Sequence, residues 1–179
     1  RGEAIEAGTD FVEGLGIDVA DHHLAVWFRS GLRSDHYTHL IRHAGIARSD
    51  SRAAARTHPW RWKLRWFRDQ EREEYRVDVG PDGRVISFDH IVAESDPGPT
   101  LSAENARVAV QTFAQTQFGV ALSDTMQFRQ LEATEEKQEA RVDHHFVWEA
   151  SADKVEEGEF RTVARYQGDQ HGRFDVWYK

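Results

Sequence analysis

Large apolar and basic side chains alternate along residues 60–67, and this is the clearest pattern in the chain. An alternation with a period of two predicts a β-strand that turns one face towards a core. The apolar face would carry Trp60, Trp62, Leu64 and Trp66, and the basic face would carry Arg61, Lys63 and Arg65. Further strands are predicted at residues 74–79 and 85–92, on either side of a Pro-Asp-Gly turn.

Two amphipathic segments predict helices, and each ends in a short apolar stretch that contains a glycine. The first covers residues 3–15 and runs into Leu-Gly-Ile. The second begins at a Ser102 cap and runs into Phe-Gly-Val around Gly119. A further helix is expected over residues 36–44, ending at Gly45.

The order of elements in the first half of the chain returns in the second half. The strand at 60–67 precedes an aromatic residue flanked by Glu and Arg at 74–76, and a strand at 142–148 precedes the same combination at 159–161. Self-similarity of this kind indicates two copies of one small unit.

We therefore predict an α+β fold made of two tandem helix-on-antiparallel-sheet units. The first unit would cover residues 1–93 and the second residues 101–179, with a polar, proline-containing linker at 94–100. Both sheets are expected to be antiparallel, because the connections have the length of hairpins.

The remaining segments complete this picture. Additional strands are expected at residues 23–29, 125–131, 160–166 and 174–178, and an acidic loop at residues 132–139. The first core should contain Phe11 with Trp60, Trp62 and Trp66, and the second should contain Phe113, Phe146, Trp148 and Phe160.

Composition narrows the classes of function. The 179 residues carry a net charge of −8, which argues against general binding of nucleic acid. There is no cysteine, so disulfides and thiolate metal sites are excluded. No apolar run approaches the roughly 20 residues that span a bilayer. Because no signal peptide is visible and the chain begins at Arg1, we interpret it as a soluble segment of a longer protein.

Three histidines form the main candidate for metal binding. His36, His39 and His43 have the spacing i, i+3 and i+7, which places them on one face of the expected helix, where imidazoles can hold zinc. No carboxylate completes an obvious site, and the His-Glu-x-x-His pattern is absent. The alternative is an ordinary polar helix face.

The basic strand at 60–67 also admits two interpretations. Aromatic residues interleaved with cations can stack on bases and follow phosphates. In the alternative, the basic face pairs with Glu74 and Asp78 on the next strand, and the acidic net charge of the chain favours this alternative.

Catalytic motifs are missing from the sequence. There is no Gly-x-Ser-x-Gly motif, no phosphate-binding glycine loop and no dinucleotide fingerprint. The carboxylates are expected in turns, where water keeps their chemistry ordinary. We therefore predict no catalytic, cofactor-binding or metal-binding residue and no cofactor.

Several strings resemble a recurring family pattern. Residues 62–67 and 73–79 resemble W-x-x-R-F-F followed by E-E-x-x-V-x-V, and residues 82–90 resemble G-x-V-x-x-F-x-H. Residues 101–106 resemble the L-s-x-e-x-A start of a helix, and residues 141–149 resemble an R-x-D-h-x-F-x-W-E strand. Together they resemble the soluble N-terminal region of bacterial membrane proteins that carry a CAAX-protease and bacteriocin-processing (CPBP) intramembrane endopeptidase domain. Each half also resembles the PepSY and cystatin-like class, in which one helix packs on an antiparallel sheet.

This resemblance places the catalytic machinery outside the chain. The family's Glu-Glu-x-x-x-Arg motif and its histidine motifs belong to transmembrane helices. Residues 156–161 match the first motif literally, but they lie in a polar hairpin with Gly158 inside it, so we interpret the match as accidental. Glu73-Glu74 misses the motif, because Asp78 stands where arginine is needed.

The expected function is therefore that of a non-catalytic sensor or substrate-recruiting domain of a membrane-embedded protease, on the extracytoplasmic (periplasmic) face of a bacterial membrane. Its partner would be a peptide or the parent's own membrane domain, bound by edge-strand addition or in a groove between the copies. The membrane would be reached only through transmembrane segments outside the chain. One alternative is a small metal-binding or enzymatic cystatin-like protein that uses the His36/His39/His43 face. Another is a nucleic-acid binder that uses Arg61, Lys63 and Arg65.

Overall fold

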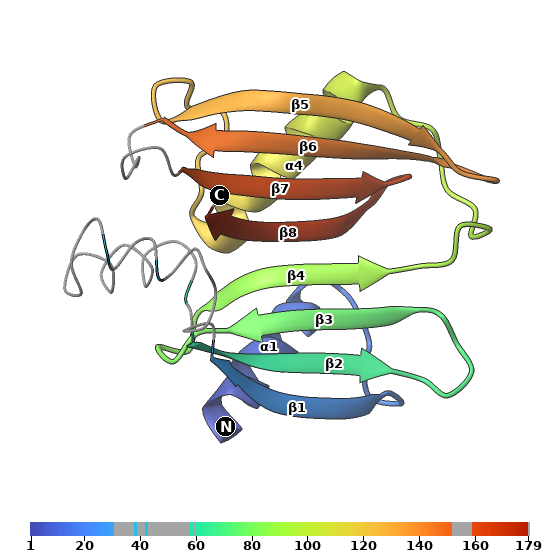
Figure 1. Cartoon of the computed structure of the whole chain (residues 1–179). Coiled ribbons are helices and arrows are strands. Elements are labelled where there is room, and N and C mark those ends of the chain that lie inside the picture. The colour runs from blue at the N-terminus through green and yellow to red at the C-terminus, as the bar shows by residue number, and fades with distance from the viewer. Residues whose placement is uncertain (31–37, 39–41, 43–57, 59, 152–158, 179) are drawn as a thin grey trace. The chain divides into compact units, whose positions relative to one another are not determined.

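The computed structural model describes residues 1–30, 38, 42, 58, 60–151 and 159–178. The fold is α+β, with helices packed on antiparallel strands in two helix-on-sheet halves (Figure 1). The chain divides into two compact units, Arg1–Ile91 and Val92–Lys179. Within the described residues, no helix is long and apolar enough to cross a lipid bilayer. The helix expected over residues 36–44 lies outside the described residues, apart from Thr38 and Arg42.

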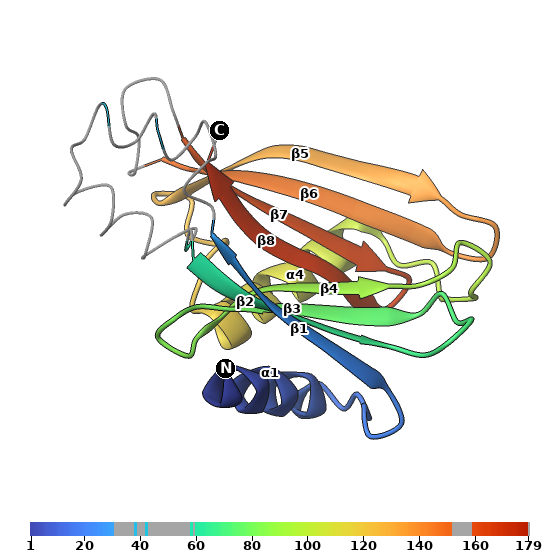
Figure 2. The same cartoon turned by 60° about the horizontal axis from the view of Figure 1, so that its bottom comes forward.

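The first unit is one helix on an antiparallel meander. Its elements are α1 (Gly2–Gly14), β1 (His23–Ser30), β2 (Trp60–Phe67), β3 (Glu74–Val79) and β4 (Val85–Ile91). The strands follow one another in space in their order along the chain, and each pairs antiparallel with the next. Helix α1 lies along one face of these strands (Figure 2).

The core of this unit lies between α1 and the central strands. Leu64 and Trp66 of β2, Val77 of β3 and Phe88 of β4 are buried. Gly8 lets α1 approach closely, because a Cβ at this position would stand 2.7 Å from Leu64 Cδ2. The expected aromatic core is thus confirmed at Trp66.

The other expected members of this core lie nearer its border. Phe11 packs edge-on against Phe88, with ring centroids 5.6 Å apart. Trp60 and Trp62 are only half-buried, and Trp62 packs against Phe28 of β1 at 5.0 Å.

The second unit repeats the arrangement of one helix followed by a meander. Its elements are α4 (Ala103–Phe118), β5 (Phe128–Lys137), β6 (Val142–Ala150), β7 (Phe160–Gln167) and β8 (Gln170–Tyr178). The strand order is β8-β7-β6-β5, again with antiparallel pairing, and α4 crosses one face of the strands in Figure 1. The predicted second core is confirmed, because Phe113, Phe146, Trp148 and Phe160 are all buried.

The predicted acidic loop is wrong over residues 132–137, which belong to β5. Their backbone pairs with β6 after a register shift between Gln130 and Glu132. Most of their side chains are exposed, so glutamates can be hydrated there at little cost. Backbone pairing, and not side-chain polarity, therefore determines the conformation of this segment.

Helix α4 begins at the predicted Ser102 cap, whose hydroxyl oxygen accepts a hydrogen bond from the Asn105 amide at 3.3 Å. We expect Ser102→Ala to lower the free energy of unfolding by about 1 kcal/mol, because an amide of the first turn loses its acceptor. Urea titration followed by circular dichroism measures the change. Thr112→Ala is the control, since this exposed residue lies inside the helix and alanine favours helices. An equal loss in both variants would contradict the assignment of the cap.

Candidate functional site

Strand β1 forms an apolar edge of the first unit. It lies at one end of the strand order, and its ladder with β2 extends from His23 to Ser30. Three of the five exposed large apolar side chains of the described residues are on it: Leu24 (37% exposed), Trp27 (43%) and Phe28 (49%). An exposed strand edge with apolar side chains offers a template for pairing with another extended chain.

Strand β5, at an end of the second unit's sheet, is a contrasting edge. It carries exposed Glu132, Glu135 and Glu136, and its register shifts near Gln130. Charges and bulges of this kind discourage pairing with other chains. The two edges therefore differ in chemistry, and β1 is the candidate for binding.

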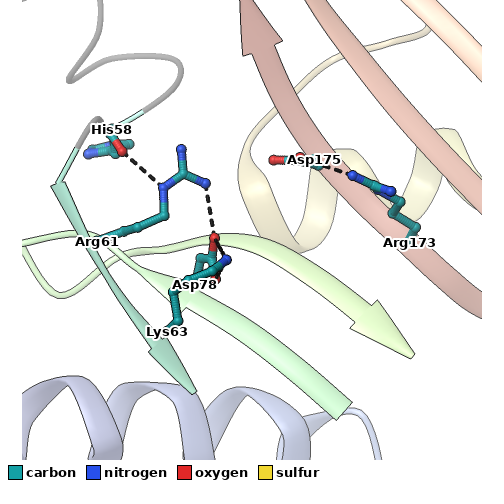
Figure 3. A network of polar contacts seen from close by, with 6 residues as sticks. All are labelled: His58, Arg61, Lys63, Asp78, Arg173 and Asp175. Atoms are coloured by element: carbon teal, nitrogen blue, oxygen red, sulfur yellow. Dashed lines mark hydrogen bonds and ion pairs between the residues drawn. The ribbon is translucent and has the colours of Figure 1, made fainter. Parts of the chain in front are cut away.

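The sheet face opposite α1 is charged, and its buried carboxylates are paired with cations of β2. Asp78 accepts hydrogen bonds from Arg61 Nη1 at 2.9 Å and Lys63 Nζ at 2.7 Å (Figure 3). Glu74 accepts one from Arg65 Nε at 2.5 Å. The predicted cross-strand pairing of the basic face with Glu74 and Asp78 is thus confirmed.

Two pairs of arginines lie directly opposite each other on this face. Arg65 faces Arg76 across the β2–β3 ladder, and both form ion pairs with Glu74. Arg29 faces Arg61 across the β1–β2 ladder. Like charges opposite each other destabilise a sheet unless an anion lies between them, as Glu74 does for the first pair.

The expectation that the carboxylates lie in turns is wrong for those that lie on strands, and four of these are buried. Glu74, Asp78, Asp143 and Glu149 are buried on strands. Each has a cationic partner, which is what allows a carboxylate to be buried. The interiors are therefore not purely aromatic.

His58 lies next to the cluster that Arg61, Lys63 and Asp78 form. Its carbonyl oxygen accepts a hydrogen bond from Arg61 Nε at 3.1 Å (Figure 3). Burial lowers the pKa of His58, while the charge of Asp82 acts in the opposite direction. The backbone of His58 thus helps to position Arg61. Figure 3 also shows Arg173 and Asp175 of β8, whose side chains lie 3.3 Å apart.

A second polar cluster joins the turn before β3 to the end of β4. The Tyr75 hydroxyl donates to Glu73 Oε1 at 2.7 Å, and His90 Nε2 lies 2.9 Å from the same oxygen. Partial burial opposes ionisation of Glu73, but the hydrogen bonds from Tyr75 and His90 outweigh it and lower its pKa. Burial and the Glu73 hydrogen bond raise the pKa of Tyr75. Tyr75 thus stays protonated and stacks on His90 at 4.5 Å, which makes this a fixed structural cluster.

In the second unit, Arg141 and Asp143 form a buried pair with Nε and Oδ1 2.8 Å apart. His144 donates from Nε2 to the Leu101 carbonyl oxygen at 3.0 Å, and His145 Nε2 lies 3.3 Å from Glu136 on the other face of β6. The two adjacent histidines therefore do not converge on one site.

The candidate metal-binding residues His36, His39 and His43, which belong to the alternative hypothesis, all lie outside the described residues. Among the residues that are described, no group of three or more His, Asp or Glu side chains could hold a metal ion. In the Glu-Glu-x-x-x-Arg string, residues 156–158 also lie outside the described part, and Arg161 forms an ion pair with Glu159.

Comparison with protein-family models, with curated protein sequences and with solved structures gives no match.

Sequence reasoning missed the apolar edge at β1, although the sequence contains a signal. Residues 24–28 are apolar at every position and lack the alternation of 60–67. A strand that is apolar on both faces is either buried in a sheet or available for a partner. Only its place at the end of the strand order distinguishes these two cases.

Proposed function

We propose that the chain is a non-catalytic binding domain that captures an extended peptide by adding it as a strand to β1. The observation that carries the proposal is the concentration of exposed Leu24, Trp27 and Phe28 on an edge strand. Main-chain hydrogen bonds along such an edge supply affinity, and alternate side chains supply specificity. The ion pairs of Arg61, Lys63 and Arg65 with carboxylates support this function over phosphate binding, because those cations are already engaged.

The wider role that we propose is that of a sensor or substrate-recruiting domain of a membrane-embedded CPBP-type protease, on the extracytoplasmic side. Its support is the resemblance of residues 62–67, 73–79, 82–90, 101–106 and 141–149 to the soluble region of such proteins. The finer assignment of each half to the PepSY and cystatin-like class has the same support, together with the helix-on-sheet arrangement. In this role β1 would hold a peptide substrate or a segment of the parent's membrane domain.

The direct test is hydrogen–deuterium exchange with a defined peptide of alternating valine and threonine. We expect added peptide to slow amide exchange at residues 23–30 of β1 and to leave residues 128–137 of β5 unchanged, because only the first edge accepts a strand. The control is the same peptide with N-methyl groups on alternate residues, which cannot complete the ladder. Unchanged exchange at β1, or equal protection by the N-methylated peptide, would overturn the proposal.

The wider role has its own test in the full reading frame of the parent. A photo-crosslinking amino acid at position 27 should capture the parent's membrane domain or a bound peptide. The control is the same amino acid at Met126, which is also apolar and is 85% exposed but is not on an edge strand. Equal capture from both positions, or none from position 27, would count against recruitment by β1.

A further inference from the structure

Arg29 places an exposed positive charge at the Ser30 end of β1. Arg29 is exposed and lies directly opposite Arg61, which in turn lies next to Lys63 on the same face of β2. Arg61 and Lys63 both form ion pairs with the buried carboxylate of Asp78. Arg29 therefore adds an exposed positive charge on the edge strand of a chain whose total charge is −8.

The opposite end of β1 differs in charge. His23 lies opposite Phe67, and Asp69 lies within 3.7 Å of the His23 ring. Arg29 is the one lysine or arginine of β1, so a strand added to β1 would meet a cation of its immediate neighbour at the Ser30 end only. An added strand lies about 5 Å from its neighbour, so an acidic residue on it opposite Arg29 is within the range of weakly screened attraction.

The apolar side chains of β1 fall on both of its faces. Leu24, Val26 and Phe28 share the α1 face with Trp66, Leu64 and Trp62, their partners in the ladder. Trp27 lies on the other face, opposite Lys63. A peptide strand on β1 therefore contacts three apolar side chains on one face, and Trp27 followed by Arg29 on the other.

From this arrangement we propose that β1 selects extended peptides that carry an acidic residue at the position opposite Arg29, followed by alternating apolar residues. The peptide runs antiparallel to β1, as in every ladder described for this chain, so the acid stands at its amino-terminal end. Counting from the acid, the second, fourth and sixth residues face Phe28, Val26 and Leu24. This proposal rests on the proposed function, which is strand addition to β1, and states which peptides β1 selects.

The probe is a capped hexapeptide that begins with glutamate and continues with alternating valine and threonine. Its matched controls replace the glutamate by glutamine or by lysine, or move it to the carboxyl-terminal end. We expect the glutamate peptide to bind about threefold more tightly than the glutamine peptide, the usual strength of one exposed ion pair, and the lysine peptide to bind more weakly than both. The preference should shrink between about 50 mM and about 500 mM salt.

Variants of the protein test whether Arg29 causes the preference for the glutamate peptide. Arg29→Glu should reverse the preference, so that the lysine peptide binds more tightly than the glutamate peptide. Arg72→Glu makes the same change of net charge at an exposed position in the turn at the other end of the strands, and it should leave the preference intact. Both positions are exposed, so neither change disturbs the core.

The outcomes separate the two proposals. Equal affinity of the glutamate and glutamine peptides, with β1 still protected from exchange, overturns the acidic specificity and leaves strand addition standing. No protection of β1 by any peptide overturns both. Tighter binding of the peptide with a carboxyl-terminal glutamate overturns the antiparallel direction. Sedimentation of the free chain should give a monomer, and a dimer that Trp27→Ser dissociates would mean that a second copy covers β1, which also overturns the proposal.

Discussion

Replacement of Arg141 by methionine is expected to lower the free energy of unfolding of the second unit by about 3–5 kcal/mol. Arg141 and Asp143 are both buried, and Arg141 Nε donates to Asp143 Oδ1 at 2.8 Å. Without the guanidinium, the Asp143 carboxylate stays buried next to Glu136, its partner on β5, and has lost its cation. Breaking a buried pair from one side is costly because the remaining charge has neither water nor a counter-ion.

The Arg141 side chain also forms hydrogen bonds with the segment before α4. Arg141 Nη1 donates to the carbonyl oxygens of Ala93 and Asp96 at 2.7 and 2.8 Å. Gly98 donates its amide to the Ala140 carbonyl oxygen at 3.2 Å, so this segment follows the start of β6 closely. We therefore expect faster amide exchange at residues 93–98 in the Arg141→Met variant.

Urea titration of three variants tests this prediction. Arg107→Met is the control for loss of an arginine, because Arg107 pairs with Glu104 on the surface of α4 and such pairs contribute less than about 1 kcal/mol. Arg141→Met combined with Asp143→Leu removes both charges and should recover most of the lost stability. A loss below about 1 kcal/mol in the single variant, or no recovery in the double variant, would contradict the buried pair.

The elements with strong local signals were predictable from the sequence. The alternation of apolar and basic residues predicted the bounds of β2 at residues 60–67. The Ser102 cap and Gly119 predicted the two ends of α4. Residues 132–137 of β5 were not predictable in this way, because a run of glutamates resembles a loop until a partner strand is known. Propensity describes the side chains, whereas strand pairing is a property of distant parts of the chain.

Within the candidate site, only the pairing of charged side chains between β2 and β3 was predictable from the sequence. Arg61, Lys63 and Arg65 alternate in β2 and Glu74 and Asp78 alternate in β3, so their pairing followed from the hairpin. The burial of those carboxylates did not follow, because it depends on what surrounds them in three dimensions. The position of β1 at an edge follows only from the strand order, and no local sequence pattern contains this order.

Acid should destabilise the second unit through His171, and this is the second large effect that we expect. The ring of His171 stacks on Phe113 at 3.9 Å and meets Tyr166 edge-on at 4.9 Å. Burial lowers the pKa of His171 from 6.5 to about 4. Above pH 6.5 the ring is neutral in both the folded and the unfolded chain, so the pKa shift has no effect on stability there.

Between pH 6.5 and about 4 the unfolded chain binds a proton that the folded chain does not, so stability falls as the pH falls. The total loss approaches about 3 kcal/mol and levels off once the folded chain is protonated too. His171→Phe keeps an aromatic ring in the stack and removes the proton site. We therefore expect the loss of stability between about pH 7 and about pH 4.5 to be about 2–3 kcal/mol smaller in this variant than in the parent chain.

Urea titrations at the two pH values measure this difference within each protein, so that a change of packing common to both pH values cancels. His145→Phe serves as the control, because this half-buried histidine lies beside Glu136 on the other face of β6 and its replacement leaves His171 in place. It should retain the full loss in acid. If the parent chain and His171→Phe lost equal stability between the two pH values, His171 would be accessible to protons in the folded chain, and the stack on Phe113 would not be the closed environment described above.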